Sequence, residues 1–337
     1  MSIFIIAEVG VNHNGDVALA KRMIDGAKEA GADCVKFQTF KAEEFVSDSA
    51  QTYTYKSQGK EITESMIEMF KRYEFNENEW REIVAYCKDR DIVFSSTAQN
   101  SSDLDFLLSI TELPFIKVGS DDLTNLNQLR YYASKKLPMI ISAGMAYAYE
   151  IEDAVNTIRE ELNNDITVLH CVSSYPTKSK DVNLKKIPTI RDAFGVKVGF
   201  SDHTQGSSAA VGAVCFGASV IEKHFTLDHN LAGPDHWFSS NQKELKAYID
   251  DIRFIEDAIG MPLLKPTKNE LKVKEIARRK IVAKFDLPKG TVLTFEMIDF
   301  KRCAIGLDPK EYKYIDKRIL KDEIKMNKAI LLKDLNE

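Results

Sequence analysis

Two histidines, His203 and His224, each follow an apolar run by one or two polar residues, in VKVGFSDHT and SVIEKHFTL. The stretch between them, 205–218, is rich in small residues, has apolar residues at helical spacing and contains no proline. We therefore expect a strand, a helix and a second, parallel strand. Both imidazoles would then lie at the carboxyl-terminal edge of a buried sheet, where α/β proteins bind ligands. The pair indicates two ligands of a divalent metal ion; the alternative for either one alone is a hydrogen-bonded core residue.

Two lysines, Lys36 and Lys117, interrupt apolar runs in DCVKFQ and FIKVGS. A lysine is rarely buried without a partner, so a function is expected: binding a carboxylate or phosphate, or forming a Schiff base as in class I aldolases. Hydroxyl side chains follow the neighbouring strands, at Thr97, Ser120, Ser142 and Ser201. Cations surrounded by hydroxyls favour phosphate binding. Lysines that simply extend to solvent remain the alternative.

Three carboxylates, Glu8, Asp202 and Asp235, are candidates for acid–base chemistry or for binding sugar hydroxyls. Glu8 directly follows the apolar run FIIA, and burial there would raise its pKa toward neutrality. Asp202 adjoins His203 and could instead orient the loop backbone. Asp235 lies in AGPDHWFS, a loop just past the second histidine, and Glu222 is expected to pair with a lysine or arginine.

The elements that position these residues alternate regularly up to about residue 260. Short runs rich in Val, Ile and Phe predict strands, and amphipathic stretches between them predict helices. The strands are expected at 3–8, 34–38, 92–96, 115–118, 139–142, 167–171, 197–200 and 219–223, and the helices at 17–30, 77–90, 124–135, 149–162, 184–193 and 244–259. This size and count predict a (β/α)8 TIM barrel over 1–260, with a doubly wound sheet as the alternative. Residues 41–61 are expected to form an extended loop over the barrel mouth.

Composition and the C-terminal segment complete the organisation. Residues 261–275 carry two prolines and read as a linker, and 276–337 predict a small β-rich domain that packs on a partner subunit. A net charge of −5 with interspersed signs indicates no nucleic-acid surface or membrane patch. Five dispersed cysteines indicate reduced thiols and a cytoplasmic location.

With these residues identified, the chain resembles the N-acetylneuraminate (sialic acid) synthase family, including the legionaminic and pseudaminic acid synthases. The motifs run in order along nearly the whole chain. They are IIAEVGVNHNGD (5–16), GADCVKFQTF (31–40), IKVGSDDLTN (116–125), ISAGM (141–145), HCVSSYPT (170–177), VGFSDHT (198–204), VIEKHFTLD (220–228), GPDH (233–236), LPKGTVLT and FKR (300–302). The last two match the family's C-terminal antifreeze-like (SAF) domain.

The resemblance implies a (β/α)8 barrel enzyme that condenses phosphoenolpyruvate with an N-acetylated hexose, giving a nine-carbon 2-keto acid and phosphate. It implies a divalent metal, usually Mn2+ with Mg2+ or Co2+ as alternatives, on His203 and His224. The residues matched to the phosphoenolpyruvate site are Lys36, Thr97, Lys117, Ser120, Ser142 and Ser201; Ser173 stands where many members have asparagine. Those matched to the sugar or the reacting carbons are Glu8, Gln38, Tyr175 and Asp235. Glu8 or Asp122 would move protons, His203 would serve catalysis through the metal, and Arg302 would reach a partner's barrel in a domain-swapped homodimer.

Departures from the family pattern concern the acceptor sugar. Asp122 stands where sialic acid synthases commonly have glutamate, and His236 after Gly-Pro-Asp resembles the legionaminic type. The acceptor is therefore N-acetylmannosamine-like or, alternatively, 2,4-diacetamido-2,4,6-trideoxymannose. The rival functions are a class I aldolase that uses one of the two lysines and a non-catalytic carbohydrate-binding protein.

Overall fold

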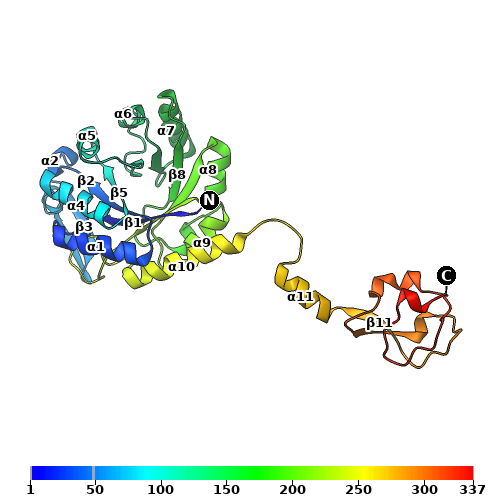
Figure 1. Ribbon diagram of the computed structural model, residues 1–337. Helices are drawn as coiled ribbons and strands as arrows, with labels where there is room; N and C mark the ends of the chain where they lie inside the picture. Colours follow the sequence, from blue (N-terminus) through cyan, green and yellow to red (C-terminus); the bar gives the residue numbers. More distant parts are fainter. Residues whose placement is uncertain (1, 48–49, 337) are drawn as a thin grey trace. The chain divides into compact units, whose positions relative to one another are not determined.

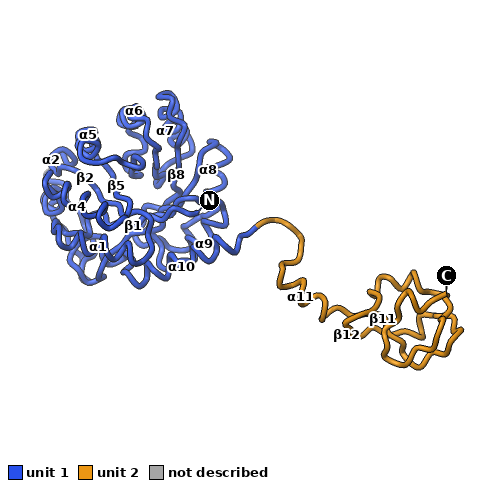
Figure 2. The backbone as a smooth tube through the Cα atoms, in the orientation of Figure 1, with its two compact units in different colours: residues 1–260 blue, residues 261–337 orange. Residues whose placement is uncertain are grey.

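The computed structural model describes residues 2–47 and 50–336. The chain forms two compact units, residues 1–260 and 261–337, which Figure 2 colours separately. Each unit has a hydrophobic core of its own: the core of the first draws on residues from Ile3 to Ile252, and that of the second on residues from Ile281 to Leu335. In the described part of the chain, no helix is both long and apolar enough to cross a bilayer.

Eight parallel strands close into a barrel in the first unit, which confirms the predicted (β/α)8 fold (Figure 1). The strands are β1 (Phe4–Gly10), β2 (Cys34–Thr39), β5 (Val93–Ala98), β6 (Ile116–Val118), β7 (Met139–Ser142), β8 (Ile166–Cys171), β9 (Lys197–Asp202) and β10 (Val220–His224). They pair in the order β1-β10-β9-β8-β7-β6-β5-β2. Nearly every strand residue is buried, because one face packs into the barrel interior and the other against helices.

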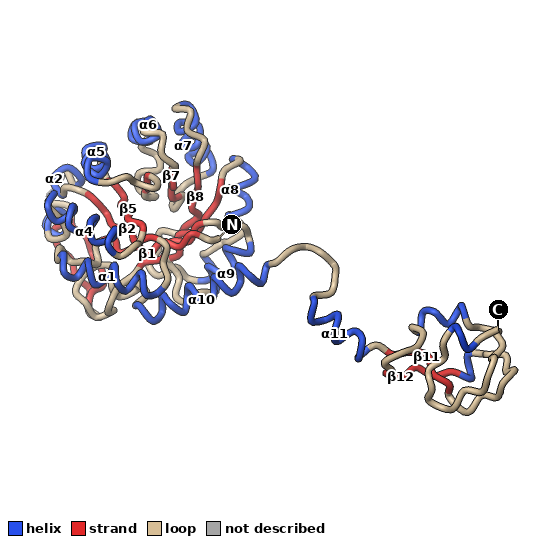
Figure 3. Tube along the Cα trace, viewed as in Figure 1, coloured by secondary structure: helices blue, strands red, loops and turns tan. Residues whose placement is uncertain are grey.

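The helices surround the strands, as the blue and red segments of Figure 3 show. They are α1 (Val17–Ala30), α4 (Glu77–Asp89), α5 (Ser101–Ile110), α6 (Leu126–Ser134), α7 (Ala148–Glu160), α8 (Lys186–Phe194), α9 (Ser208–Cys215) and α10 (Gln242–Ile259). Strong local signals set their ends: Asp16 caps the first turn of α1, and Gly31 closes it in the left-handed conformation. The sequence analysis missed α5, although the Asn100 amide donates to Asp103 Oδ2 at 2.9 Å in a capping arrangement.

The prediction that residues 41–61 form an extended loop is wrong, because the segment has regular secondary structure. The described part of this segment forms a short helix, α2 (Ala42–Phe45), and an antiparallel hairpin of β3 (Thr52–Ser57) and β4 (Lys60–Ser65), followed by α3 (Met66–Lys71); residues 48 and 49 lie outside the described residues. The turn holds Gln58 and Gly59 at φ of 50° and 77°. Two positive φ values match the twist of a two-residue hairpin, a signal that the sequence carried in QG.

The second unit contains α11 (Lys268–Ala277) and a two-stranded sheet of β11 (Arg279–Ala283) and β12 (Ile298–Arg302). Short 3-10 turns and isolated β-bridges complete it. The stretch predicted as a linker is therefore partly helical. Thr267 and Glu270 form a capping box there, with the Thr267 amide donating to Glu270 Oε2 at 2.7 Å.

Candidate active site

The polar residues that end the barrel strands converge on one cavity of about 890 Å³. Its lining includes nearly all the residues predicted for the site: Glu8, Lys36, Gln38, Thr97, Lys117, Ser120, Ser142, Ser173, Tyr175, Ser201, His203, His224 and Asp235. Parallel strands bring their carboxyl ends to one edge, so residues far apart in sequence meet there. The placement expected from the sequence is therefore observed for this set.

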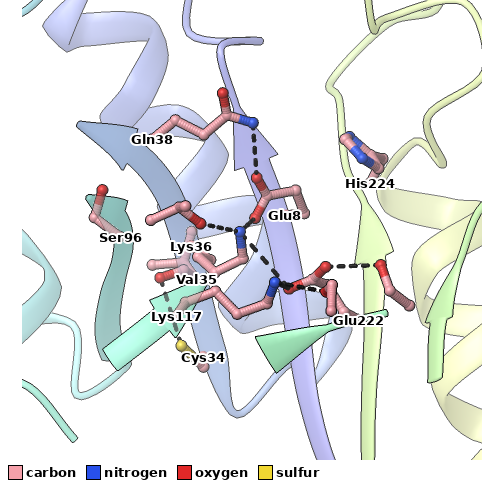
Figure 4. A network of polar contacts seen from close by, with 12 residues as sticks. Glu8, Cys34, Val35, Lys36, Gln38, Ser96, Lys117, Glu222 and His224 are labelled. Atoms are coloured by element: carbon pink, nitrogen blue, oxygen red, sulfur yellow. Dashed lines mark hydrogen bonds and ion pairs between the residues drawn. The ribbon is translucent and has the colours of Figure 1, made fainter. Parts of the chain in front are cut away.

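Lys36 lies at the centre of a buried polar network on the cavity floor (Figure 4). Its Nζ is 2.5 Å from Glu8 Oε2, donates to Thr97 Oγ1 at 3.0 Å and lies 3.6 Å from Glu222 Oε2. Gln38 Nε2 donates to the other Glu8 oxygen at 3.4 Å. The side chain of Lys36 is 4 % exposed, so the alternative that it extends to solvent is wrong.

Lys117 is the second buried cation of the floor. Its Nζ donates to Ser142 Oγ at 2.9 Å and to the carbonyl of Val118 at 3.1 Å, and lies 3.8 Å from Glu222 Oε2. Glu222 thus stands between the two lysines, and Ser201 Oγ donates to its Oε1 at 2.8 Å. A basic partner for Glu222 was expected from the sequence, and the structure supplies two, Lys36 and Lys117.

The four buried ionisable groups of the floor, two glutamates and two lysines, differ in the direction of their pKa shifts. Burial alone would raise the pKa of Glu222, but Lys117 and Lys36 outweigh it and lower that pKa to about 2. Burial raises the pKa of Glu8 to about 7, although Lys36 opposes the rise. Burial would lower the pKa of Lys36, yet Glu222 and Glu8 raise it, whereas burial lowers the pKa of Lys117.

The charge balance of the floor follows from these shifts. Two ammonium groups face the ionised Glu222 and a Glu8 that is only partly ionised near neutral pH, so the floor carries a net positive charge. The hydroxyls of Thr97, Ser142 and Ser120 surround it, and Ser120 Oγ accepts from the amide of Gly144 at 3.0 Å. Such a floor can bind an anion with several oxygen atoms.

The two histidines lie beside this floor with ring centroids 5.5 Å apart. His203 Nδ1 is 2.7 Å from the carbonyl of Val172, and because a carbonyl only accepts, this nitrogen carries the proton. Burial lowers the pKa of both imidazoles, so they are neutral and His203 Nε2 keeps its lone pair. His224 Nδ1 is buried and has no hydrogen-bond partner among the described residues.

This donor set fits a divalent metal ion. A neutral imidazole whose other nitrogen donates to a carbonyl is the usual form of a metal-binding histidine, and His203 has that arrangement. The bare Nδ1 of His224 is a second donor in the same cavity. Within residues 2–47 and 50–336, no group of three His, Cys, Asp or Glu side chains could hold an ion by itself. Substrate or water oxygens would have to complete its coordination.

The wall of the cavity above the histidines is aromatic and apolar. Tyr175 packs on His203 at 4.2 Å between ring centroids and edge-on to His224 at 5.8 Å. The remaining wall residues come largely from the hairpin, α3 and the β10–α10 loop, and the sequence analysis did not identify them: Phe45, Tyr53, Tyr55, Lys56, Glu61, Met66, Met69, Phe70, Trp237 and Phe238. For the hairpin, the alternation of polar and aromatic residues in TYTYKS was the signal that could have revealed a strand.

Three residues that the sequence analysis considered for the site do not line the cavity: Asp122, Asp202 and Arg302. Asp122 is half-buried outside it, and its neighbour Asp121 takes the place in the lining. A one-residue offset in the turn after β6 was enough to exchange them. Arg302 is exposed at the end of β12, in the second unit.

Two other histidines have structural partners. His170 Nε2 is 2.6 Å from the carbonyl of Val182, and His236 Nδ1 is 2.7 Å from Thr226 Oγ1. Both are buried, and neither lines the cavity. His170 is therefore a hydrogen-bonded core residue.

Comparison with known proteins gives a consistent result. The model of the NeuB family matches residues 23–263. An N,N'-diacetyllegionaminic acid synthase of Legionella pneumophila is 40% identical over 315 residues, covering 92% of this chain and 88% of the relative. Human N-acetylneuraminate-9-phosphate synthase is 37% identical, covering 92% and 84%. A crystal structure of N-acetylneuraminic acid synthetase from Leptospira borgpetersenii, in complex with citrate, superposes with a TM-score of 0.72 at 33% identity, covering 83% of this chain and 94% of that one.

Proposed function

The chain belongs to the NeuB family, and we propose that it is a nonulosonic acid synthase that condenses phosphoenolpyruvate with an N-acetylated hexose. The products are a nine-carbon 2-keto sugar acid and phosphate. One observation carries the proposal: Lys36 and Lys117 share the Glu222 carboxylate on a hydroxyl-lined floor, directly beside two neutral imidazoles. An anion and an aldehyde can bind side by side in this cavity.

The residues of the floor would hold phosphoenolpyruvate. The ammonium groups of Lys36 and Lys117 and the hydroxyls of Thr97, Ser142 and Ser120 bind its phosphate and carboxylate oxygens. The methylene carbon then attacks the aldehyde carbon of the open-chain sugar, whose C=O electron pair moves to oxygen and takes up a proton to give a hydroxyl. Water adds at C2, and the C–O bond to phosphate breaks, which leaves the 2-keto group and free phosphate. Glu8, whose pKa lies near 7, accepts the proton of that water.

His203 and His224 would hold the divalent ion. We propose Mn2+, with Mg2+ or Co2+ as alternatives; a bound ion supplies Lewis-acid polarisation of the aldehyde. Tyr175, Gln38, Asp235 and Ser173 line the remaining cavity and would orient the sugar. Asp235 is half-buried, and desolvation raises its pKa to about 7, so it can donate or accept a hydrogen bond there.

The charge and polarity of the cavity wall indicate which acceptor sugar can bind. Besides the two floor lysines, Lys56 is the one lysine or arginine among the described lining residues, and its Nζ lies over the Trp237 ring at 4.8 Å. Glu61 adds a negative charge to the same wall. Lys56 contacts Trp237 and faces Glu61 across the hairpin, so the described wall offers a sugar phosphate no unopposed cation, which favours an unphosphorylated acceptor. N-acetylmannosamine fits, and the apolar residues favour 2,4-diacetamido-2,4,6-trideoxymannose, whose C6 is a methyl group.

The proposal is tested by incubating the enzyme with phosphoenolpyruvate, Mn2+ and a panel of N-acetylmannosamine, its 6-phosphate and the diacetamido sugar, and following phosphate release. We expect release with an unphosphorylated acceptor and its loss with EDTA. Phosphate release with none of the sugars would contradict the proposal. Trapping of pyruvate on Lys36 or Lys117 by borohydride would instead indicate a Schiff-base aldolase.

The second unit would complete the assembly. We propose that residues 276–337 form an antifreeze-like (SAF) domain and that Arg302 reaches the cavity of a partner subunit, making a domain-swapped homodimer in the cytoplasm. The exposed guanidinium on β12 has the chemistry to bind a sugar oxygen or a carboxylate. The filled set of anion-binding and imidazole positions argues against a non-catalytic scaffold.

A further inference from the structure

A buried ion pair lies directly behind the two histidines. In the register of β9 and β10, Ser201 pairs with Glu222 and Asp202 with Lys223. Ser201 and Glu222 line the cavity, so the next residue on each strand points outward, toward the helices, and the imidazoles that follow point inward again. Asp202 and Lys223 are 1% and 2% exposed and do not line the cavity.

The pair is part of a connected network. Lys223 Nζ is 3.4 Å from Asp202 Oδ2, and Tyr248 on α10 donates its hydroxyl to the same oxygen at 2.9 Å. The other oxygen, Asp202 Oδ1, accepts from the amide of Thr204 at 2.8 Å. Lys223 Nζ also donates to the carbonyl of Thr204 and lies over the Tyr248 ring at 5.2 Å.

The contacts flank His203 on both sides and reach the residue before His224. Asp202 precedes His203 and Thr204 follows it, and both are held by Lys223, the residue before His224. A change in the separation of the two strand ends would therefore break the ion pair. Because a buried charge without its partner is costly, the network opposes that change.

We propose that Asp202, Lys223 and Tyr248 are positioning residues that fix the separation of the two imidazoles and thereby the affinity for the divalent ion. This inference rests on the proposed function, which places an ion on His203 and His224. The network itself touches neither cavity nor substrate, so its effect passes through the histidines. Groups that orient metal ligands commonly change metal affinity by about 10- to 100-fold when they are removed.

The experiment measures Mn2+ binding to metal-free protein by the electron paramagnetic resonance of free Mn2+, without any substrate. The double variant Asp202→Asn/Lys223→Met removes both charges together and leaves no unpaired buried ion. We expect its Mn2+ Kd to rise about tenfold or more. Tyr248→Phe keeps the ring and removes one hydrogen bond, and we expect about a threefold rise, the size of one net hydrogen bond. Activity of both variants should recover as Mn2+ is raised, with the KM for phosphoenolpyruvate unchanged.

The matched control is Asp165→Asn/Lys197→Met, which removes an exposed 2.8 Å ion pair at the opposite end of β9. Its Mn2+ affinity should equal that of the wild type. Wild-type affinity in the folded double variant, or in Tyr248→Phe if the double variant does not fold, overturns the inference alone. Failure of the wild-type protein to bind Mn2+ overturns the proposed metal site, and this inference with it.

Discussion

At the residue scale, the floor of the cavity shows two glutamates with opposite behaviour. Glu222 lies near both lysines and accepts a hydrogen bond from Ser201, so it stays ionised. Glu8 contacts only Lys36, and burial raises its pKa by more than that lysine lowers it. Neighbouring carboxyl groups whose environments separate their pKa values are typical of acid–base sites.

Replacing Glu8 tests its proposed role in proton transfer. Glu8→Gln keeps the size of the side chain but cannot accept a proton, and we expect kcat to fall about 10²- to 10⁴-fold. Measured against pH, the wild-type kcat/KM should rise through about pH 7 as Glu8 ionises, and the variant should lack that ionisation. Asp122→Asn is the matched control, because Asp122 lies outside the cavity. Full activity of Glu8→Gln would exclude the role.

A second residue-scale prediction concerns acid stability. His13 is buried against Phe75, with ring centroids 4.1 Å apart, and burial lowers its pKa to about 3. The unfolded chain binds a proton near pH 6.5 and the native state does not, so this contribution to stability is present above pH 6.5 and is lost as pH falls toward 3. His13→Phe should reduce the dependence of unfolding free energy on pH in this window by up to about 1.4 kcal/mol per pH unit.

Urea unfolding followed by tryptophan fluorescence measures this slope for the barrel, since Trp80 and Trp237 both belong to residues 1–260. His13→Phe also removes the acceptor of the Gly15 amide, which adds a pH-independent loss. The slope and the offset are therefore separable. Equal slopes for wild type and variant would show that His13 does not govern the acid response.

At the element scale, the hairpin is tied to the loop that carries Asp235. Gln58 Nε2 donates to the carbonyl of Asn230 at 2.9 Å, and the amide of Gly233 donates to Ser57 Oγ at 3.1 Å. The hairpin tip and the β10–α10 loop thus support each other as two walls of one cavity. An element of this kind is expected to influence acceptor choice more than phosphoenolpyruvate binding.

Strand β9 gives an element-scale prediction at Gly199. A Cβ there would lie 2.4 Å from Leu169 Cδ2 and 2.5 Å from the carbonyl oxygen of Val220. The backbone of β10 cannot move aside without disturbing its pairing in the barrel. Gly199→Ala should therefore lower the unfolding free energy by about 1–3 kcal/mol. The measurement is urea unfolding with tryptophan fluorescence.

Gly212→Ala is the matched control on α9. Its Cβ would meet only the flexible tip of Leu184, and alanine favours a helix. Its loss of stability should be much smaller than that of Gly199→Ala. Equal stability of Gly199→Ala and wild type would contradict the crowding argument.

At the scale of the whole molecule, the two units have separate cores, and the proposed link between them is Arg302 acting on a partner's barrel. Lys36→Ala and Arg302→Ala should each be inactive alone. Co-expressed, they should recover about a quarter of wild-type activity, because half of the dimers are mixed and each holds one complete site. No recovery in mixed dimers isolated by two affinity tags would show that Arg302 acts within its own chain, and full activity of Arg302→Ala alone would show that it has no role at the site.

The sequence alone determined the barrel and most of the site. Strand ends were readable because buried parallel strands are continuous apolar runs that end abruptly. The polar residues that follow the predicted strands, such as Thr97, His203 and His224, therefore share one edge. Every predicted strand lies within two residues of its observed bounds. These features depend on local pattern and on the closure of the barrel.

Only the tertiary structure decided which polar groups meet. It placed Glu222 between two lysines, chose Asp121 over Asp122 for the cavity, and joined Asp202 to Lys223 behind the histidines. Each outcome depends on strand register or turn geometry, where a shift of one residue turns a side chain to the opposite face. Charge pairing across strands is a long-range property, and no local pattern encodes it.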